Sequence, residues 1–503
     1  MRLRSFSAAI LCGLFFLTLL ASASTTYYVA TNGNDAGSCK TAATACKTIS
    51  HAVTLATTAG STIQVGAGTY VENVTLSNPG ASGANIVLTG STTANTCPAT
   101  PFTDVNSPTG NRPAPTAEIN GLVTMAASYL TVNCFHIVPT GKGAVIANIA
   151  TTGGVISNNN IDGTPDGAGP TAVNGGGIGF GGVDSAPAAQ YAANYTISGN
   201  YIHGVSTGIW FACSSCTVTR NEITALAGDE PGVDHDYIDA WGIGSTFSHN
   251  YMHANTCNSC YGYDCHMDCI QTWNTVGNGT EVSKNMTFTR NVCFNHHEGV
   301  IVQDNAGNSD VSNWTVSNNV FAYGPYDDGS GHLCVAGPAH PWCWILEDGA
   351  LGSNNNFLNN TCIDGAEGFE QNSGSAQFKD NLFLSLGSES VVYQTSGATV
   401  SGANNLYYAV DATFNGGTFP GDIFGKNPEI ISAGTGSAAQ QCIGCNFNIQ
   451  SISAARDAGV DTGVGIDLLG TVRPQGPAYD IGAYEFIPTA KPLPPTGLGA
   501  VVH

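Results

Sequence analysis

One short pattern of apolar and polar residues recurs through the middle of the chain. It consists of an apolar residue, two polar residues, an asparagine, one variable residue and a second apolar residue. Copies are ISNNNI (156–161), ISGNYI (197–202), VTRNEI (218–223), FSHNYM (247–252), FTRNVC (288–293), VSNNVF (316–321), FLNNTC (357–362), FKDNLF (378–383) and, more loosely, ANNLYY (403–408). Each copy predicts a short strand, a turn at the asparagine and another short strand, because asparagine tolerates the left-handed backbone of a tight corner.

The spacing of these asparagines predicts a solenoid. They are Asn159, Asn200, Asn221, Asn250, Asn291, Asn319, Asn360, Asn381 and Asn405, with separations of 41, 21, 29, 41, 28, 41, 21 and 24 residues. The values cluster near one or two units of about 20 residues, which indicates stacked structural repeats. Stacked in register, the asparagine side chains can form amide ladders.

A helix is expected before the repeats begin. KTISHAVTLATTAG (47–60) has Ile49, Ala52, Val53 and Ala56 on one helical face. A helix here would cap the open end of the solenoid, as a terminal repeat requires. The following STIQVGAGTYVENVTL (61–76) would supply the first strands.

These features resemble the right-handed parallel β-helix of the pectin-lyase-like superfamily. TTYYVATNGNDAGSC (25–39) looks like the opening of secreted bacterial β-helix proteins, and GIDLLGTVRPQGPAYDIGAYEF (465–486) is similar to their closing segment, of the choice-of-anchor type. The resemblance implies an all-β, single-stranded right-handed parallel β-helix with an N-terminal capping helix. It does not select an activity, because one fold of this kind hosts lyases, hydrolases, epimerases and adhesins.

The chain divides into three parts. Residues 1–23 read as a secretory signal peptide, with Arg2 and Arg4 before an apolar run and a cleavage site near Ala23. Residues 24–486 form the predicted β-helix domain, and residues 487–503 a Pro-rich tail. No later run approaches the roughly 18 apolar residues of a membrane span. We therefore expect a secreted, extracellular or periplasmic protein, monomeric and not inserted in a membrane.

Charge and cysteine content narrow the expected partners. Without the signal peptide, 12 basic and 36 acidic residues give a net charge of −24. This charge argues against nucleic acid, which needs basic patches, and against a polyanionic glycan unless a cation bridges it. Loss of Cys12 leaves sixteen cysteines, an even number typical of disulfides in an exported protein. Close neighbours are Cys39/Cys46, Cys213/Cys216, Cys257/Cys260, Cys334/Cys343 and Cys442/Cys445; zinc bound by Cys257, Cys260, His266 and Cys269 is a less favoured alternative.

Three segments form a polar ladder in the predicted solenoid. They are DHDYIDAW (234–241), HMDCIQTW (266–273) and HHEGVIVQ (296–303). Aligned, they give one column of Asp236, Asp268 and Glu298 and a second of Asp234, His266 and His296. Asp236 and Ile238 would share a face in an unbroken strand, which favours a bend between them.

Two chemistries fit this ladder. Neighbouring rungs lie about 4.8 Å apart, so carboxylates one or two rungs apart bracket the separations of retaining and inverting glycosidases, roughly 5–5.5 and 6.5–9.5 Å. Hydrolysis of a glycosidic bond is therefore preferred. The catalytic candidates are Asp236, Asp268, Glu298, His266, His296 and Tyr261; Trp241, Trp273, Gln271, Gln303 and Asp304 are the substrate-binding candidates.

The second chemistry is proton abstraction beside a uronate carboxylate. Tyr-Gly-Tyr-Asp-Cys-His (261–266) is similar to the Tyr-Gly-Phe-Asp-Pro-His signature of secreted mannuronan C5-epimerases, with Cys265 in place of proline. This resemblance implies a uronate lyase or epimerase. Calcium is a candidate ion, with Asp234 and Asp239 among its possible ligands, since it prefers oxygen ligands. A third interpretation is a non-catalytic glycan-binding or cell-surface protein, in which the ladder is a hydrogen-bonded or solvated stack.

Overall fold

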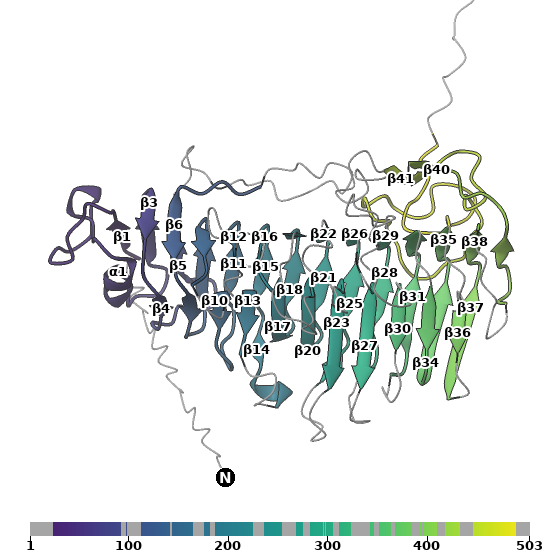
Figure 1. Cartoon of the computed structure of the whole chain (residues 1–503), viewed down its shortest axis with the longest axis horizontal. Helices are drawn as coiled ribbons and strands as arrows, with labels where there is room; N and C mark the ends of the chain where they lie inside the picture. The colour runs from purple at the N-terminus through teal and green to yellow at the C-terminus, as the bar shows by residue number, and fades with distance from the viewer. Residues whose placement is uncertain are drawn as a thin grey trace, which may run out of the picture.

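The computed structural model shows an elongated stack of short parallel strands (Figure 1). It describes residues 24–91, 97, 112–140, 143–163, 176–181, 187–224, 236–253, 268–274, 282–294, 296, 298–304, 311–322, 343–346, 352–363, 368–384, 392–394, 397–409, 418–432 and 446–488. The side chains of residues 274, 303, 304, 392 and 393 lie outside this description. Within the described part, no helix has the length and apolar character needed to cross a membrane.

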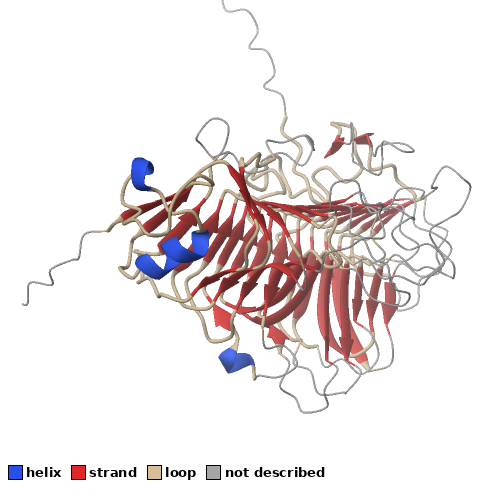
Figure 2. Cartoon of the chain, turned by 60° about the vertical axis from the view of Figure 1, so that its left-hand side comes forward, coloured by secondary structure: helices blue, strands red, loops and turns tan. Residues whose placement is uncertain are grey.

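Three parallel sheets form the faces of the stack (Figure 2). Sheet A consists of β1 (Thr26–Val29), β2 (Thr62–Val65), β5 (Ile86–Thr89), β8 (Leu130–Asn133), β11 (Val155–Ser157), β15 (Thr196–Ser198), β18 (Thr217–Thr219), β21 (Thr246–Ser248), β25 (Thr287–Thr289), β28 (Thr315–Ser317), β31 (Asn355–Leu358), β34 (Gly374–Lys379) and β37 (Ala398–Ala403). Sheet B consists of β3 (Gly68–Tyr70), β6 (Ala117–Asn120), β9 (His136–Val138), β12 (Asn160–Asp162), β16 (Tyr201–His203), β19 (Glu222–Thr224), β22 (Tyr251–His253), β26 (Val292–Phe294), β29 (Val320–Ala322), β32 (Thr361–Ile363), β35 (Leu382–Leu384), β38 (Leu406–Tyr408) and β39 (Ile423–Phe424).

Sheet C completes the coil. It consists of β4 (Val74–Leu76), β7 (Val123–Met125), β10 (Gly143–Ala147), β13 (Gly176–Phe180), β17 (Ile209–Ser214), β20 (Ile238–Ile243), β23 (Ile270–Asn274), β27 (Val300–Asp304), β30 (Trp344–Leu346), β33 (Phe369–Gln371) and β36 (Val392–Gln394), with β14 (Ala192–Ala193) and β24 (Ser283–Lys284) at its edge. The short helices are η1 (Ala42–Thr44), α1 (Ile49–Leu55) and η2 (Ala188–Gln190), and β40 (Ile430–Ser432) and β41 (Asn446–Ile449) form an antiparallel pair.

Each turn passes from sheet C to sheet A to sheet B and back to sheet C. For example, β17, β18 and β19 make one turn, and β17 then pairs in parallel with β20 of the next. Crossovers between parallel strands are right-handed as a rule. The chain is thus a solenoid, as the asparagine repeat predicts, and it is the right-handed parallel β-helix that the resemblance implies.

Inward-facing apolar side chains fill the coil. A row of phenylalanines runs through its C-terminal half with ring centroids 5.8–6.5 Å apart: Phe247, Phe288, Phe321, Phe357 and Phe378. Each is almost fully buried, and burying such a ring contributes roughly 1.5–3 kcal/mol. Neighbouring turns are therefore joined by side-chain stacking as well as by strand pairing.

The recurring asparagines form a buried amide ladder between sheets A and B, as predicted. Asn250 is representative: its backbone N and Nδ2 donate to Oδ1 of Asn291 at 2.9 and 3.0 Å, and Nδ2 also donates to the Val218 carbonyl at 3.0 Å. The ladder ends at Asn405, whose N and Nδ2 both donate to Oδ1 of Asp422. A carboxylate is suited to this last position because the side chain there accepts hydrogen bonds from Asn405 and has no further ladder residue to which it must donate.

The left-handed residue of each corner is the one before the ladder asparagine, and not the asparagine itself as the sequence pattern suggests. These residues have φ values of 53–65°: Asn158, Gly199, Arg220, His249, Arg290, Asn318, Asn359, Asp380 and Asn404. The ladder asparagine is thereby left to point its amide along the coil axis, while the preceding residue makes the sharp turn.

A helix covers the N-terminal end of the core, as expected. Thr48 caps α1 by accepting a hydrogen bond from the His51 backbone N–H, and Ile49, Ala52 and Val53 are buried. The helix ends at Leu55, earlier than the sequence pattern indicates. Two threonines follow Ala56, and β-branched residues are poorer helix formers than alanine or leucine.

The C-terminal segment 446–488 folds back over the outer face of sheet B (Figure 1). There it covers apolar side chains of four strands, including Val292, Phe294, Val320 and Ile363. The segment contains residues 465–486, and in this structure these residues pack on the solenoid.

A buried arginine ties this segment together. The Arg473 guanidinium lies 3.0 Å from Oε2 of Glu485 and also donates to the Asp480 and Gly482 carbonyls and to Oδ1 of Asn318. Both partners of the ion pair are fully buried. Removing one partner of such a pair costs about 3–5 kcal/mol because it leaves an uncompensated charge.

Asp380 makes the attachment of this segment sensitive to pH. Its Oδ2 accepts a hydrogen bond from the Val460 N–H at 2.9 Å, but burial raises the pKa of Asp380 to about 7. The unfolded value is about 3.9, so this group favours the folded protein below that pH and loses its contribution as the pH rises toward 7. Asp380→Asn keeps the acceptor, and we expect a higher melting temperature than wild type at pH 8 and a flatter pH profile between 4 and about 7.

The measurement is thermal unfolding across that range. The exposed Asp461→Asn serves as the control because it removes a carboxylate from the same segment. A profile of Asp380→Asn with the wild-type slope would contradict the assignment.

Five disulfides lie among the described residues: Cys39–Cys46, Cys97–Cys134, Cys213–Cys216, Cys269–Cys293 and Cys343–Cys362. The local pairs Cys39/Cys46 and Cys213/Cys216 agree with their spacing. Cys343 is bonded to Cys362 and not to its close neighbour in sequence, Cys334, because the coil brings the Cα atoms of Cys343 and Cys362 within 6.3 Å. Cys257/Cys260 and Cys442/Cys445 lie outside the described residues.

Candidate functional site

The column of carboxylates lies where the chain enters sheet C. Asp236, Asp268 and Glu298 each stand two residues before β20, β23 and β27. The backbone continues the parallel pairing there: the residues after Asp236 and Asp268 donate to the Asp268 and Glu298 carbonyls at 3.0 and 2.9 Å. A bend follows each of the three residues, as the shared parity with Ile238 predicts. The structure thus places these carboxylates on three successive turns.

The carboxylates also bond to the backbone of the next turn. Oδ1 of Asp236 accepts from the Asp268 N–H at 2.8 Å, and Oδ1 of Asp268 accepts from the Glu298 N–H at 2.9 Å. Both aspartates are 0% exposed and Glu298 is 4% exposed. One oxygen of each aspartate therefore holds the fold together, much as the asparagine ladder does.

His296 precedes this column on the third turn. It is buried, and its ring packs edge-on against Phe321 of the phenylalanine row, with centroids 5.9 Å apart. This contact places the imidazole against the core. The Asp234 and His266 positions of its predicted column lie outside the described residues, as does Tyr261.

The outer face of sheet C carries a second polar pair. Asp239 of β20 is the direct neighbour of Gln271 on β23, and on its other side it pairs with Trp210 of β17. Phe211 packs inside the coil against Phe247, so strand alternation turns its neighbour Trp210 outward. Asp239 and Gln271 are buried on this face.

Three tryptophans gather beside this pair. Trp241 lies 5.0 Å from Trp210 and 4.6 Å from Trp273, measured between ring centroids. Trp241 is almost fully buried and donates its indole N–H to the Trp273 carbonyl. It is the buried member of the cluster, whereas Trp210 and Trp273 are partly exposed. Trp210 was missed at the sequence level, although it stands one turn before Asp239 in register.

The remaining predicted binding residues follow on the next turn. Gln303 pairs through its backbone with Trp273, and Asp304 pairs with Asn274. Their side chains lie outside the described structure. The next strands in the column present Ile301 and Ile345 to the outside, where they contact each other.

No cluster of metal ligands forms around Asp239 within the described residues. There, the one group of three potential ligand atoms in close contact is Cys39, Cys46 and His51, and its sulfurs form a disulfide. The zinc set proposed from spacing is wrong in one member, because Cys269 is bonded to Cys293. Asp234, the other proposed calcium ligand, lies outside the described residues.

Sheet B holds a separate set of titratable groups on its outer face. Arg112 donates to both carboxylate oxygens of Glu222, and Nε2 of His253 lies 2.9 Å from Oε1 of Glu222. Burial disfavours the charge on Glu222, but the hydrogen bonds from His253 and Arg112 outweigh it and lower its pKa. On neighbouring turns, His136 lies between Glu118 and Asp162, and hydrogen bonding to Asp162 raises its pKa despite burial. These groups form ion pairs with one another.

Comparison with known proteins bears on the fold of the chain. No family model and no curated protein matches the sequence. Among solved structures, the pectate lyase Pel9A is 13% identical, with a TM-score of 0.51 over 92% of this chain and 97% of that chain. The likeness is one of fold.

Two further solved structures resemble the chain more distantly. The PL6 family alginate lyase AlyGC is 12% identical over 82% of this chain and 58% of that chain, with a TM-score of 0.43. The GH136 lacto-N-biosidase from Eubacterium ramulus is 11% identical over 78% and 68%, also with a TM-score of 0.43.

Proposed function

We propose that this protein is a secreted polysaccharide-active enzyme that hydrolyses glycosidic bonds. The observation that carries the proposal is the column Asp236, Asp268 and Glu298 on successive turns, at the entry to the sheet that also carries the partly exposed Trp210 and Trp273. Aromatic rings beside carboxylates suit a sugar, whose apolar ring face stacks while its hydroxyls bond to acceptors.

Asp268 and Glu298 are the proposed reacting pair. Adjacent strands lie about 4.8 Å apart, close to the roughly 5–5.5 Å carboxylate separation of retaining glycosidases. One carboxylic acid gives its proton to the glycosidic oxygen as the bond to the anomeric carbon breaks, and the other carboxylate attacks that carbon. Water then hydrolyses the glycosyl-enzyme and returns a proton to the first carboxylate, so one water is consumed for each bond cleaved. Asp236, which holds the Asp268 backbone, is proposed as a positioning residue.

A neutral glycan is the proposed substrate. Strands β17, β20, β23, β27, β30 and β33 of sheet C contain no lysine, arginine or histidine within their described bounds, whereas they contain Asp239 and Glu370. A polyuronate would be repelled here unless a cation such as calcium bridged it. A uronate lyase or epimerase, and a non-catalytic glycan-binding protein, are the alternatives that the experiment must separate.

The test is a panel of neutral and acidic polysaccharides, incubated with and without a chelator. We expect new reducing ends from a neutral glycan, no ultraviolet absorbance of an unsaturated uronate, and no effect of the chelator. That absorbance with an acidic glycan would identify a lyase. Binding without turnover on every glycan would overturn the enzymatic proposal.

A further inference from the structure

A cavity far from the carboxylate column opens on the outer face of sheet A, near the N-terminal end. Its volume is about 740 Å³. The floor is one column of side chains on four consecutive strands: Tyr28, Gln64, Thr89 and Asn133 are direct register neighbours on β1, β2, β5 and β8. A preformed hollow of this size is in the usual range for small-ligand sites, about 300–1,000 Å³.

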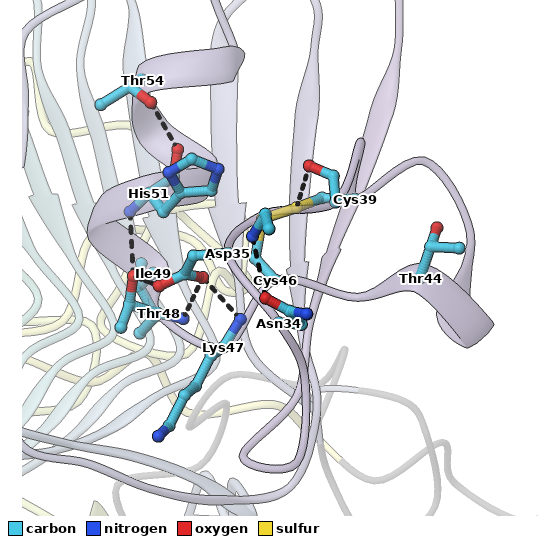
Figure 3. Close-up of a disulfide and its surroundings, with 12 residues drawn as sticks. Asn34, Asp35, Cys39, Thr44, Cys46, Lys47, Thr48, Ile49, His51 and Thr54 are labelled. Atoms are coloured by element: carbon cyan, nitrogen blue, oxygen red, sulfur yellow. Dashed lines mark hydrogen bonds between the residues drawn. A yellow bond between two sulfur atoms is a disulfide. The ribbon is translucent and has the colours of Figure 1, made fainter.

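The first wall of the cavity is a loop that includes Ala42 and Ala45. The Cys39–Cys46 disulfide closes this loop, and Asp35 accepts hydrogen bonds from the backbone N–H groups of Lys47 and Thr48 at 2.7 and 3.0 Å (Figure 3). The loop is also bonded to the floor strand, since the Cys46 N–H donates to the Tyr28 carbonyl at 2.8 Å. This wall is therefore fixed to the sheet at several points.

The opposite wall is held in the same way. Cys97 and Cys134 both line the cavity and are joined by a disulfide, and Cys134 directly follows Asn133 at the end of β8. Beyond β8 the same column continues along sheet A as Ser157, Ser198 and Thr219. None of these three lines the cavity. The column of side chains is therefore the floor of a cleft only where the two walls, each held by a disulfide, stand beside it.

The described lining is uncharged and combines apolar groups, such as Val65 and Ala67, with a few polar side chains. Tyr28 offers a ring face and a hydroxyl, Gln64 an amide, and Thr89 a hydroxyl, while no aspartate, glutamate, lysine, arginine or histidine lines the cavity among the described residues. The Gln64 amide is only weakly engaged, with a 3.4 Å contact from Nε2 to the Gly90 carbonyl. In a protein of net charge −22 at pH 7, an uncharged lining that offers hydroxyl and amide groups beside apolar surface favours a ligand that carries hydroxyls and has no charge of its own.

We propose that this cavity is a second, non-catalytic binding site for a neutral saccharide. The sugar ring stacks on Tyr28, and its hydroxyls bond to Gln64 and Thr89. The inference rests on the proposed function in one respect: the saccharide is taken to be part of the polymer that the carboxylate column cleaves.

The location suits a polymer that touches the protein twice. The cavity lies on sheet A and reaches as far as β8. Two further strands of that sheet, β11 and β15, separate β8 from β18, and β18 belongs to the same turn as β17. The candidate active site begins at β17 on sheet C, another face of the coil. A short oligosaccharide can occupy only one of the two sites, whereas a long chain gains effective concentration at the second once it is held at the first.

The experiment measures binding of short neutral gluco-, xylo- and manno-oligosaccharides by calorimetry, with oligogalacturonate as the charged probe. It is carried out in the Asp268→Asn protein, so that no probe is cleaved. We expect Tyr28→Ala and Gln64→Leu each to weaken one class of binding sites for a neutral probe by roughly tenfold or more. Thr217→Ala, which removes an exposed hydroxyl from the same sheet face outside the cavity, should leave binding unchanged.

Activity supplies the second readout. In the otherwise wild-type protein, Tyr28→Ala should raise KM for the polymer and leave turnover of a short substrate unchanged. No saturable binding of any neutral probe, equal binding of the charged probe, or binding that is unaffected by both cavity variants would overturn the inference. Cleavage that persists with such a result leaves the proposed function intact, whereas cavity-dependent binding without cleavage of any glycan overturns the proposed function alone.

Discussion

Asp268→Asn should abolish most of the glycan hydrolysis while leaving the protein folded. The amide oxygen can still accept the Glu298 N–H that Asp268 holds at 2.9 Å, so the local structure is preserved. What is lost is a group that can carry the negative charge or the proton of the reaction. A general acid or base contributes about 10²–10⁴-fold to the rate, and a loss of that order in kcat is the expected result. Glu298→Gln should show a loss of similar size.

The control for this pair is Glu118→Gln, a carboxylate on the outer face of sheet B that interacts with His136. It removes the same charge far from the proposed reaction, and its kcat should equal that of wild type. Circular dichroism and the melting temperature report whether each variant is folded. Wild-type kcat in folded Asp268→Asn would refute the assignment of this carboxylate.

Asn250→Ala should destabilise the solenoid more than any surface substitution. Oδ1 of Asn250 accepts both the backbone N–H and the side-chain amide of Asn221, and Nδ2 donates to Asn291 and Val218. Truncation leaves several of these buried groups unpaired, and each such group costs about 1–3 kcal/mol. We expect a loss of about 3 kcal/mol or more in the free energy of unfolding, measured by denaturant titration.

The matched control is Asn356→Ala on the outer face of sheet A, where the side-chain amide donates only to the nearby Asn354 carbonyl. It should change the free energy of unfolding by less than about 1 kcal/mol. A sharper comparison uses the end of the ladder. Asn250→Asp removes a needed donor and buries a charge, whereas Asp422→Asn keeps the Oδ1 acceptor for Asn405 and loses only the Oδ2 acceptor of the Phe419 N–H. Equal destabilisation by the two would contradict the directional reading of the ladder.

The sequence predicted the parts of the fold that repeat. The asparagine spacing leads to the ladder because each asparagine bonds to its own copy one turn away, so the periodicity of the sequence is the periodicity of the contacts. The fold of the C-terminal segment over sheet B could not be read in this way. Outward-facing residues such as Val292 and Phe294 cannot be distinguished from core residues in the sequence pattern. The one indication is that the polar Tyr-Ile-His (201–203) changes to the apolar Val-Cys-Phe (292–294) at equivalent positions, where the C-terminal segment begins to cover sheet B.

The candidate site was predicted to a similar extent. Register within the three polar segments was enough to place Asp236, Asp268 and Glu298 on successive turns. The burial of each side chain could not be predicted, because outward strand positions can be solvated or covered. Trp241 was expected on the surface, but it is buried and donates its indole N–H to the Trp273 carbonyl. The Cys343–Cys362 disulfide was missed for another reason, since it joins two walls of the coil and sequence distance does not report the space between walls.

The corner residues before the ladder asparagines affect how the solenoid unfolds. On four successive turns these residues reach the C-terminal segment: Asn318 bonds to Ile466, Asn359 to Thr462 and Asp480, Asp380 to Val460, and Asn404 to Ala458. A solenoid held only by nearest-neighbour contacts can fray one turn at a time from its open end. Here the C-terminal segment spans the last turns, so unfolding from this end requires that this segment detach first. The turns that it covers should then unfold together as one cooperative unit.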